Sequence, residues 1–353
     1  LPLEIASIYG PELADAKPDS SCPLTIMPPR SIPRLTASLV LVAPLVHAAF
    51  QITGNAISSS CAGTSVASCM NTTAVQDLCC FEAPGGLLLQ TQFWDTNPET
   101  GPVDSWTIHG LWPDHCDLSF SESCDPSRAY KNIAGLLSAQ GAQSTLDYMK
   151  TYWVDIDGQN ERFWEHEWST HGTCYSTLKP SCLPQGSPQG AEAVAFFNTV
   201  VGLFQQLPTY TWLANQGITP SSSATYDLQT LTDALQTGAG FAPVLDCRGS
   251  SLDSVSWYFH LQGSLLDGTM VPVGAPEKGT CPSTGIKYVP KSLSGSHETT
   301  PRRKQQPARR RHHHRHTEDS GLVEQQQQQD QAPLQDEGHH GHQHHGHGHN
   351  DEL

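Results

Sequence analysis

The sequence predicts an α+β fold for residues 49–290, and three observations support this class. Segments typical of strands and of helices follow one another without the regular strand–helix–strand alternation of parallel α/β folds. The length of 353 residues suits one large domain or two small ones. Ten of the eleven cysteines lie within 49–290, which marks this segment as one disulfide-bearing unit.

The elements are expected in the following order. Residues 86–94 form an apolar run between Pro84-Gly85 and Asn97-Pro98, a pattern that predicts a buried strand. A second strand is expected at 105–111. Helices are expected at 127–137, 144–153, 191–206 and 223–236, the last of them after a serine-rich cap. Alternation predicts a further strand at 254–261.

The charge is strongly acidic and belongs mainly to the central segment. The chain has 35 acidic and 19 basic residues, of which 22 and eight lie in 49–290. Apolar residues make up 37%, with 26 prolines and 29 glycines, so part of the chain is expected to lie outside any core. This balance argues against an electrostatic coat for DNA of the histone kind, but it leaves room for a nuclease with a small local site.

The N-terminal region carries a targeting pattern. Two arginines precede an apolar run at 35–48 that ends in small residues, which predicts a signal peptide over 27–48. The run is too short to span a bilayer comfortably, so we expect no membrane span. A signal peptide normally begins at the first methionine, whereas here 26 residues precede Met27. We therefore hypothesise that translation starts at Met27. Residues 1–26, with Cys22, would then be an extension that the native protein lacks.

The C-terminal residues 291–353 have a different composition. They are rich in Arg, Gln and His, with twelve of the 18 histidines, and are expected to form a disordered tail. The imidazoles could bind Zn²⁺, Cu²⁺ or Ni²⁺ weakly, or the tail could be a solvated linker with no metal role. The last four residues, Asn350 to Leu353, resemble the K/H-D-E-L retrieval signal with Asn in place of the basic residue. We therefore expect a mainly extracellular or vacuolar protein, with partial retention in the endoplasmic reticulum as the lesser outcome.

The ten central cysteines predict five disulfides formed in an oxidising compartment. A zinc ribbon would need paired C-x-x-C spacings, and the sequence has none. Spacing alone does not choose among the possible connectivities.

Two short segments concentrate the chemistry. They are WTIHGLWPDHC at 106–116 and FWEHEWSTHGTC at 163–174, and they hold four of the five central histidines; the fifth is His260. On an α-helix, Glu167 and His171 would share a face, whereas His166 and His171 would stand about 140° apart. Two imidazoles can divide proton removal and proton donation, while a third with a carboxyl group steadies a charged centre. Cleavage of RNA by its own 2′-OH requires such a set.

Other interpretations fit less well. A zincin needs H-E-x-x-H, and the spacing here is H-E-x-x-x-H. A serine hydrolase of the Ser/His/Asp type would carry a G-x-S-x-G elbow, and the sequence contains none. Buried structural histidines are the general alternative for any single histidine, but three of them with a glutamate and four tryptophans make that alternative weak.

IHGLWPD (108–114) and HEWSTHGTC (166–174) resemble the two active-site segments of the ribonuclease T2 family, and the resemblance covers about Cys61 to Cys281. It implies one α+β domain with a mostly antiparallel central sheet, surrounding helices and five disulfides. It also implies an endoribonuclease, secreted or vacuolar, that cleaves single-stranded RNA by transphosphorylation through a 2′,3′-cyclic phosphate and needs no cofactor.

The resemblance also implies roles for individual residues. His171 would be the general base toward the 2′-OH and His109 the general acid at the 5′-oxygen. His166 would bind phosphate, and Glu167 would help to stabilise the pentacovalent centre. The expected base-binding residues are Trp112, Asp114 and Phe120 in a primary site and Phe163 in a second site, where each aromatic could instead be plain core packing. Many family members have Lys before the base histidine, and this chain has Thr170, which brings no charge.

The fungal pattern of the family implies the disulfides Cys61–Cys80, Cys69–Cys116, Cys79–Cys182, Cys124–Cys174 and Cys247–Cys281. Asn71-Thr72-Thr73 is the only N-x-S/T glycosylation acceptor in the sequence.

The sequence thus predicts a monomeric, metal-independent endoribonuclease whose partner is single-stranded RNA and not DNA. Two rival functions stay open. One is a catalytically silent nuclease fold that serves as a binding or storage protein, and the other is a metal-binding protein that acts through the His-rich tail.

Overall fold

The structure is a computed structural model that describes residues 49–61, 66–96 and 99–291. The predictions for residues 1–26, for the signal peptide at 27–48 and for the tail, the NDEL signal included, lie outside these residues.

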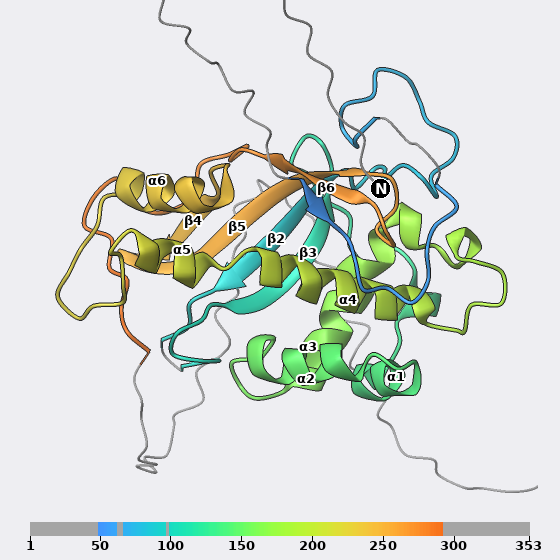
Figure 1. Cartoon of the computed structure of the whole chain (residues 1–353), viewed down its shortest axis with the longest axis horizontal. Coiled ribbons are helices and arrows are strands. Elements are labelled where there is room, and N and C mark those ends of the chain that lie inside the picture. The colour runs from blue at the N-terminus through green and yellow to red at the C-terminus, as the bar shows by residue number, and fades with distance from the viewer. Residues whose placement is uncertain (1–48, 62–65, 97–98, 292–353) are drawn as a thin grey trace, which may run out of the picture. The chain divides into compact units, whose positions relative to one another are not determined.

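A six-stranded antiparallel sheet organises the domain (Figure 1). The strand order is β1-β6-β5-β2-β3. Strand β4 pairs with the first half of β5 and β6 with the second half, both on the edge opposite β2. The long β5 lies next to β2, while β3 is an end strand of this order. The strands are β1 (Phe50–Gln51), β2 (Leu87–Phe93), β3 (Thr107–Asp114), β4 (Val244–Arg248), β5 (Ser251–Gln262) and β6 (Thr269–Val273).

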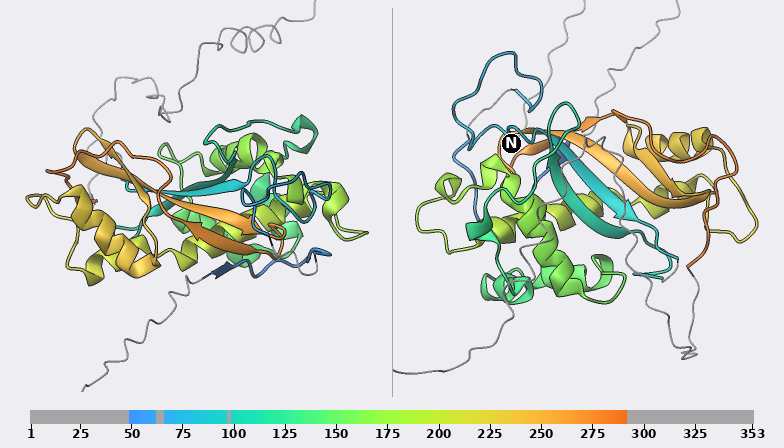
Figure 2. Two further views of the ribbon diagram at one scale, coloured as in Figure 1. Left: turned by 90° about the horizontal axis from the view of Figure 1, so that it is seen from above. Right: turned by 180° about the vertical axis from the view of Figure 1, so that it is seen from behind.

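Helices lie on one face of the sheet and beside β3. Helices α4 and α5 cross the face that Figure 1 shows, and the view from behind shows the opposite face, with α3 beside β3 (Figure 2). The helices are α1 (Ile133–Ala139), α2 (Gln143–Tyr152), α3 (Asn160–His166), α4 (Ala191–Gln206), α5 (Thr209–Asn215) and α6 (Leu228–Ala239). A π-helical turn at Glu167–His171 continues α3. Short 3₁₀ turns lie at Pro126–Arg128, Gly172–Cys174, Ser176–Leu178 and Pro180–Cys182.

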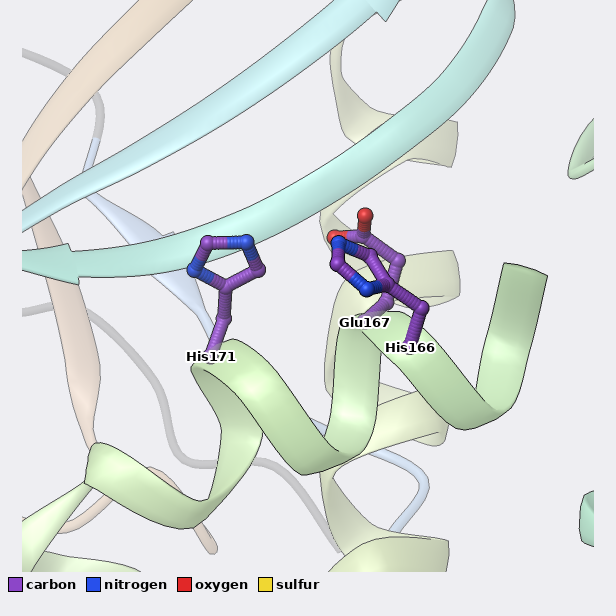
Figure 3. Close-up of side chains that lie close together, drawn as sticks. All are labelled: His166, Glu167 and His171. Atoms are coloured by element: carbon purple, nitrogen blue, oxygen red, sulfur yellow. The ribbon is translucent and has the colours of Figure 1, made fainter. Parts of the chain in front are cut away.

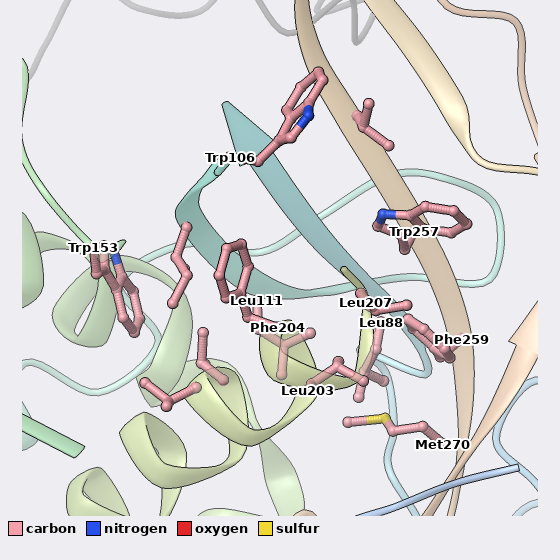
Figure 4. Close-up of a cluster of buried hydrophobic side chains, with 14 of the residues drawn as sticks. Leu88, Trp106, Leu111, Trp153, Leu203, Phe204, Leu207, Trp257, Phe259 and Met270 are labelled. Carbon is pink, nitrogen blue, oxygen red and sulfur yellow. The ribbon is translucent and has the colours of Figure 1, made fainter. Parts of the chain in front are cut away.

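The main hydrophobic core fills the space between the sheet and α4 (Figure 4). Leu88 of β2 and Phe259 of β5 are fully buried there, against Leu203 and Phe204 of α4. Burial of each such side chain stabilises the fold by about 1.5–3 kcal/mol. A second, smaller cluster on the other face contains Trp112, so β3 carries buried residues on both faces.

Most predicted elements are confirmed, with shifts at their ends. The helix expected at 191–206 has these bounds, and the strands expected at 86–94 and 254–261 are β2 and β5. The strand expected at 105–111 is β3, which runs on to Asp114.

Two expected helices differ from the structure, and several elements were not predicted. The helix expected at 127–137 is wrong in its first half, where a 3₁₀ turn and four non-helical residues precede α1. Asn132, in a left-handed conformation, caps α1, so the helix begins only at Ile133. The helix expected at 223–236 begins only at Leu228. Strands β1, β4 and β6 and helices α3 and α5 are short, and their sequences carry too little periodicity to reveal them.

Five disulfides are present, and each joins the two cysteines that the resemblance pairs: Cys61–Cys80, Cys69–Cys116, Cys79–Cys182, Cys124–Cys174 and Cys247–Cys281. Among the described residues, none of the helices has the length and apolar character needed to cross a membrane.

Candidate active site

A β-bulge places His109. Thr91 of β2 lies opposite Gly110 of β3, and Gln92 lies opposite Ile108, so His109 is the extra residue between them. Ile108 and Leu111 are only three residues apart, yet both are fully buried in the main core. Bulges redirect side chains in this way and are common beside active sites. His109 consequently lies next to Trp112, with 4.7 Å between the ring centroids.

The π-helical turn after α3 brings two further histidines together. The backbone N–H of Gly172 donates to the carbonyl oxygen of Glu167, five residues earlier. In such a turn residues five apart approach the same face. The angle of about 140° between His166 and His171, expected for an α-helix, is therefore wrong. Figure 3 shows His166, Glu167 and His171 extending from this turn toward β3.

These three side chains lie close enough to hold a metal ion by distance alone, since one potential ligand atom of each lies within 4.8 Å of the others. The H-E-x-x-x-H spacing argues against a zincin, which needs two imidazoles four residues apart, and does not by itself exclude a site of this kind. A metal ligand must be deprotonated, and burial raises the pKa of the Glu167 carboxyl group to about 8, so a metal ion would have to displace its proton.

Glu167 is the buried centre of the site. Its side chain is inaccessible to solvent, and burial raises its pKa to about 8. The indole N–H of Trp112 donates to Oε2 over 2.8 Å and opposes this rise. Oε1 lies 3.7 Å from Nε2 of His109. The carboxyl group is thus neutral below about pH 8, and a positive charge on His109 would favour its ionised form.

Gly110 makes this close approach possible. A Cβ atom at this position would lie 2.1 Å from Oε2 of Glu167 and 2.6 Å from Nε1 of Trp112. Any side chain there would occupy the place of the Trp112–Glu167 hydrogen bond.

Aromatic rings surround the two histidines. Phe93 of β2 packs on His109 with 4.0 Å between centroids, and Phe163 of α3 lies 5.7 Å from it. The ring of Trp112 stacks on His171 at 4.8 Å. Trp112 therefore contacts His109, His171 and Glu167 at once, and is only 6% exposed.

His166 lies at the outer side of the site. Its ring centroid is 5.8 Å from that of His171, and its Nδ1 is 3.3 Å from the hydroxyl of Thr170. Desolvation lowers the pKa of His166, the charge of Arg162 acts in the same direction, and that of Glu122 opposes it. A lowered pKa leaves more of this imidazole neutral near pH 6.

Asp114 and Phe120 are the remaining predicted residues. Asp114 stands five residues beyond His109 on β3, or roughly 16 Å along a strand. It is buried, and desolvation with the charge of Glu277 raises its pKa to about 8. Its Oδ2 forms no hydrogen bond within the described part of the chain. Phe120 is half-buried in the segment after β3.

The structure thus brings His109, Trp112, Phe163, His166, Glu167, Thr170 and His171 together, and adds two residues that the sequence did not point to. Phe93 carried no signal, because it ends an apolar strand like any core residue. Gly110 did carry a sequence signal, because glycine is unfavourable inside a strand and often marks a bulge or a close approach of another group.

Two disulfides brace the segments that carry the site. Cys69–Cys116 fixes the chain just after β3, and Cys124–Cys174 fixes the chain just after the π-helical turn.

The fold and the site together define a disulfide-braced α+β protein with a histidine-based acid–base site. A family model described as the ribonuclease T2 family matches residues 85–267, and the chain belongs to this family.

Relatives and solved structures agree with this assignment. Ribonuclease Le2 of Lentinula edodes is 63% identical over 238 residues, which cover 67% of this chain and 99% of the relative. Ribonuclease Trv of Hypocrea rufa is 53% identical over 66% of this chain and 99% of its own length. The crystal structure of Actibind, described as a T2 ribonuclease, has a TM-score of 0.63 at 47% identity and covers 67% of this chain and 99% of that one.

Proposed function

We propose that this T2-family ribonuclease cleaves single-stranded RNA by transphosphorylation to a 2′,3′-cyclic phosphate, which it then hydrolyses to a 3′-phosphate. One observation carries the proposal. His109 from a strand and His171 from a helical turn both contact Trp112, with ring centroids 4.7 and 4.8 Å away, and the neutral carboxyl of Glu167 binds the same indole. Two imidazoles beside one carboxyl group suit proton removal and proton donation at a single phosphate.

The proposed first step uses the two histidines in opposite senses. His171 takes the proton of the 2′-OH, and that oxygen attacks phosphorus. His109 gives a proton to the 5′-oxygen, which leaves. In the second step His109 takes a proton from water, the water oxygen attacks phosphorus, and the bond between phosphorus and the 2′-oxygen breaks. His171 gives its proton to the leaving 2′-oxygen, which restores the 2′-OH and leaves a 3′-phosphate, so the two histidines exchange roles. A DNA strand has no 2′-OH and is not expected to react.

Glu167 acts as a neutral acid in this proposal. Because burial raises its pKa to about 8, its O–H group is available as a hydrogen-bond donor to a non-bridging phosphoryl oxygen. Such a donor in a buried place stabilises charge that develops in the transition state. His166, with Thr170 beside it, binds the phosphate from the outer side.

Base binding is assigned to the aromatic residues around the site. Phe163 lies against His109, and Trp112 and Phe120 serve the primary base site together with Asp114. With a pKa of about 8, Asp114 is neutral in acid and can both donate and accept hydrogen bonds to a base edge.

The test is to incubate the protein with homopolymeric RNA, with and without EDTA, and to analyse the ends. We expect cyclic phosphate ends in both conditions and no cleavage of single-stranded DNA. Loss of cleavage in EDTA would refute the metal-independent mechanism and favour the metal site at His166, Glu167 and His171. Absence of any cleavage would favour the rival function, a silent nuclease fold.

The five disulfides also support a secretory location, because such bonds persist in oxidising compartments. We propose a monomer that is exported, with a glycan on Asn71, which is exposed to solvent. Comparison of secreted and retained enzyme with and without residues 350–353 tests the retrieval signal. Retention of the full chain but export of the truncated one would show that Asn350 is tolerated.

A further inference from the structure

The segment from His115 to Cys124, which follows β3, carries Phe120 and is tied to the active site at both ends. Cys116 is bonded to Cys69, and Cys124 to Cys174. Near the second end, the backbone N–H of Ser123 donates to the carbonyl oxygen of Thr170 over 2.8 Å, which attaches the segment to the π-helical turn. Between these ties Leu118 packs against the smaller hydrophobic cluster that contains Trp112, and hydrogen bonds within the segment add to these restraints.

A tight turn forms its first half. The backbone N–H of His115 donates to the carbonyl oxygen of Ser119 over 2.7 Å, and that of Leu118 donates to the carbonyl oxygen of His115. Leu118 has a φ of 69°, a conformation that a leucine adopts only when its surroundings enforce it. Asp117 supports the turn, since its Oδ1 accepts from both the backbone N–H and the hydroxyl of Ser119.

The imidazole of His115 then joins this turn to the residue beyond Phe120. Its Nδ1 lies 2.9 Å from the hydroxyl oxygen of Ser119, and its Nε2 lies 3.0 Å from that of Ser121. Phe120 is therefore held between two serines that bind the same ring.

The direction of these hydrogen bonds follows from the proton count. A hydroxyl group has one proton, and that of Ser119 is donated to Oδ1 of Asp117 over 2.5 Å. The oxygen of Ser119 must then accept from the Nδ1–H of His115. In the neutral imidazole, Nε2 accepts from the hydroxyl of Ser121. The result is one directed chain from Ser121 through His115 and Ser119 to Asp117.

We propose that His115 is a positioning residue for substrate binding: through Ser119 and Ser121 it fixes the backbone on both sides of Phe120 and so sets the affinity of the base site that Phe120 forms. This inference rests on the proposed function. His115 touches neither His109, Glu167 nor His171 in any contact of the described residues, so its loss leaves the catalytic groups in place. A preorganised base platform lowers the entropy cost of binding the base.

The test is a double-mutant cycle between His115→Ala and Phe120→Ala, with KM and kcat measured on dinucleoside phosphates. We expect His115→Ala to raise KM about five- to tenfold, as for one or two lost neutral hydrogen bonds, with kcat within about twofold. Because His115 acts through Phe120, the double variant should be no worse than Phe120→Ala alone.

Matched variants keep the test independent of folding. Ser119→Ala breaks the directed chain at one atom and should raise KM in the same sense. Ser187→Ala is the control, because it removes the hydroxyl of another exposed turn, which donates to the carbonyl oxygen of Pro184 and lies outside the segment of His115 to Cys124. His115→Asn keeps a donor near the place of Nδ1 and should restore most of the affinity.

The outcomes separate this inference from the proposed function. If the wild-type protein cleaves no RNA, or if Phe120→Ala leaves KM unchanged, the proposed function or its base site is wrong. If Phe120→Ala raises KM but His115→Ala and Ser119→Ala behave like Ser187→Ala, the inference is overturned. Additive effects in the double variant, or a fall in kcat without a change in KM, overturn it as well.

Discussion

Gly110→Ala is expected to inactivate the enzyme although it adds one methyl group outside the set of reacting residues. The new Cβ would lie 2.1 Å from Oε2 of Glu167, and ordinary contact begins at 3.4 Å, so the carboxyl group must move by about 1.3 Å. Nε1 of Trp112 is 2.6 Å from the same point, so the indole must also move away from it. The 2.8 Å hydrogen bond between the two side chains is therefore lost.

The magnitude follows from these two effects. Overpacking of a buried site costs about 1–3 kcal/mol of the free energy of unfolding. A displacement of about 1 Å among reacting groups lowers kcat by about 100-fold. Both the carboxyl group and the indole that contacts the two histidines are displaced, so we expect a loss of kcat of this order with a smaller change in KM.

The assay is steady-state cleavage of RNA, paired with urea unfolding and with thiol titration to show that all disulfides have formed. Gly202→Ala in α4 is the matched control, because its Cβ would have no neighbour closer than 4.0 Å and alanine favours a helix by up to about 1 kcal/mol. If Gly110→Ala folds and keeps kcat within about threefold of the wild type, the geometry around Glu167 does not govern catalysis and the reasoning is wrong.

Three further predictions follow from the site. His109→Ala and His171→Ala should each lower kcat by about 10²–10⁴-fold with circular dichroism unchanged, and activity retained in either variant would exclude the two-histidine mechanism. Glu82, a buried carboxyl group outside the site that contacts Ser176 and Thr177, has a pKa raised by burial to about 7, as that of Glu167 is raised to about 8. Both values lie above those of the unfolded chain, so the folded domain holds protons that the unfolded chain releases. Their contribution to stability is complete below about pH 4 and is lost as the pH rises to about 8, so urea midpoints should fall across this range, and Glu167→Gln should make the fall shallower. Thr170→Lys places a cation beside His166 and should raise kcat several-fold with a stronger dependence on salt, whereas an unchanged kcat would mean that the threonine hydroxyl already suffices.

The sequence by itself determined the class of fold, the two segments that form the candidate active site and the histidines that we propose as acid and base. Long elements such as α4 and β5 were predictable because many residues repeat the same apolar pattern, so local preference and burial agree. The two motifs were recognisable because histidine, tryptophan and acidic residues are rarely so concentrated in a chain with few central histidines.

Only the tertiary structure decided how these residues meet. The bulge at His109 and the π-helical turn before Gly172 each add one residue to a regular element. The hydrophobic pattern of the sequence does not reveal them, because one extra residue shifts the register of the pattern without changing the residue types. Without the turn, His166 and His171 would diverge. Without the bulge, His109 could not lie beside Trp112 while Ile108 and Leu111 both fill the core.

The protonation of the carboxyl groups was likewise beyond the sequence. Glu167 is an ordinary acid in the chain, and its raised pKa arises from burial between β3 and the π-helical turn, where Gly110 leaves room for it. Desolvation depends on every group packed around a charge, and those groups come from segments far apart in the sequence. The residue types were therefore set locally, whereas their charge states and distances were set by packing.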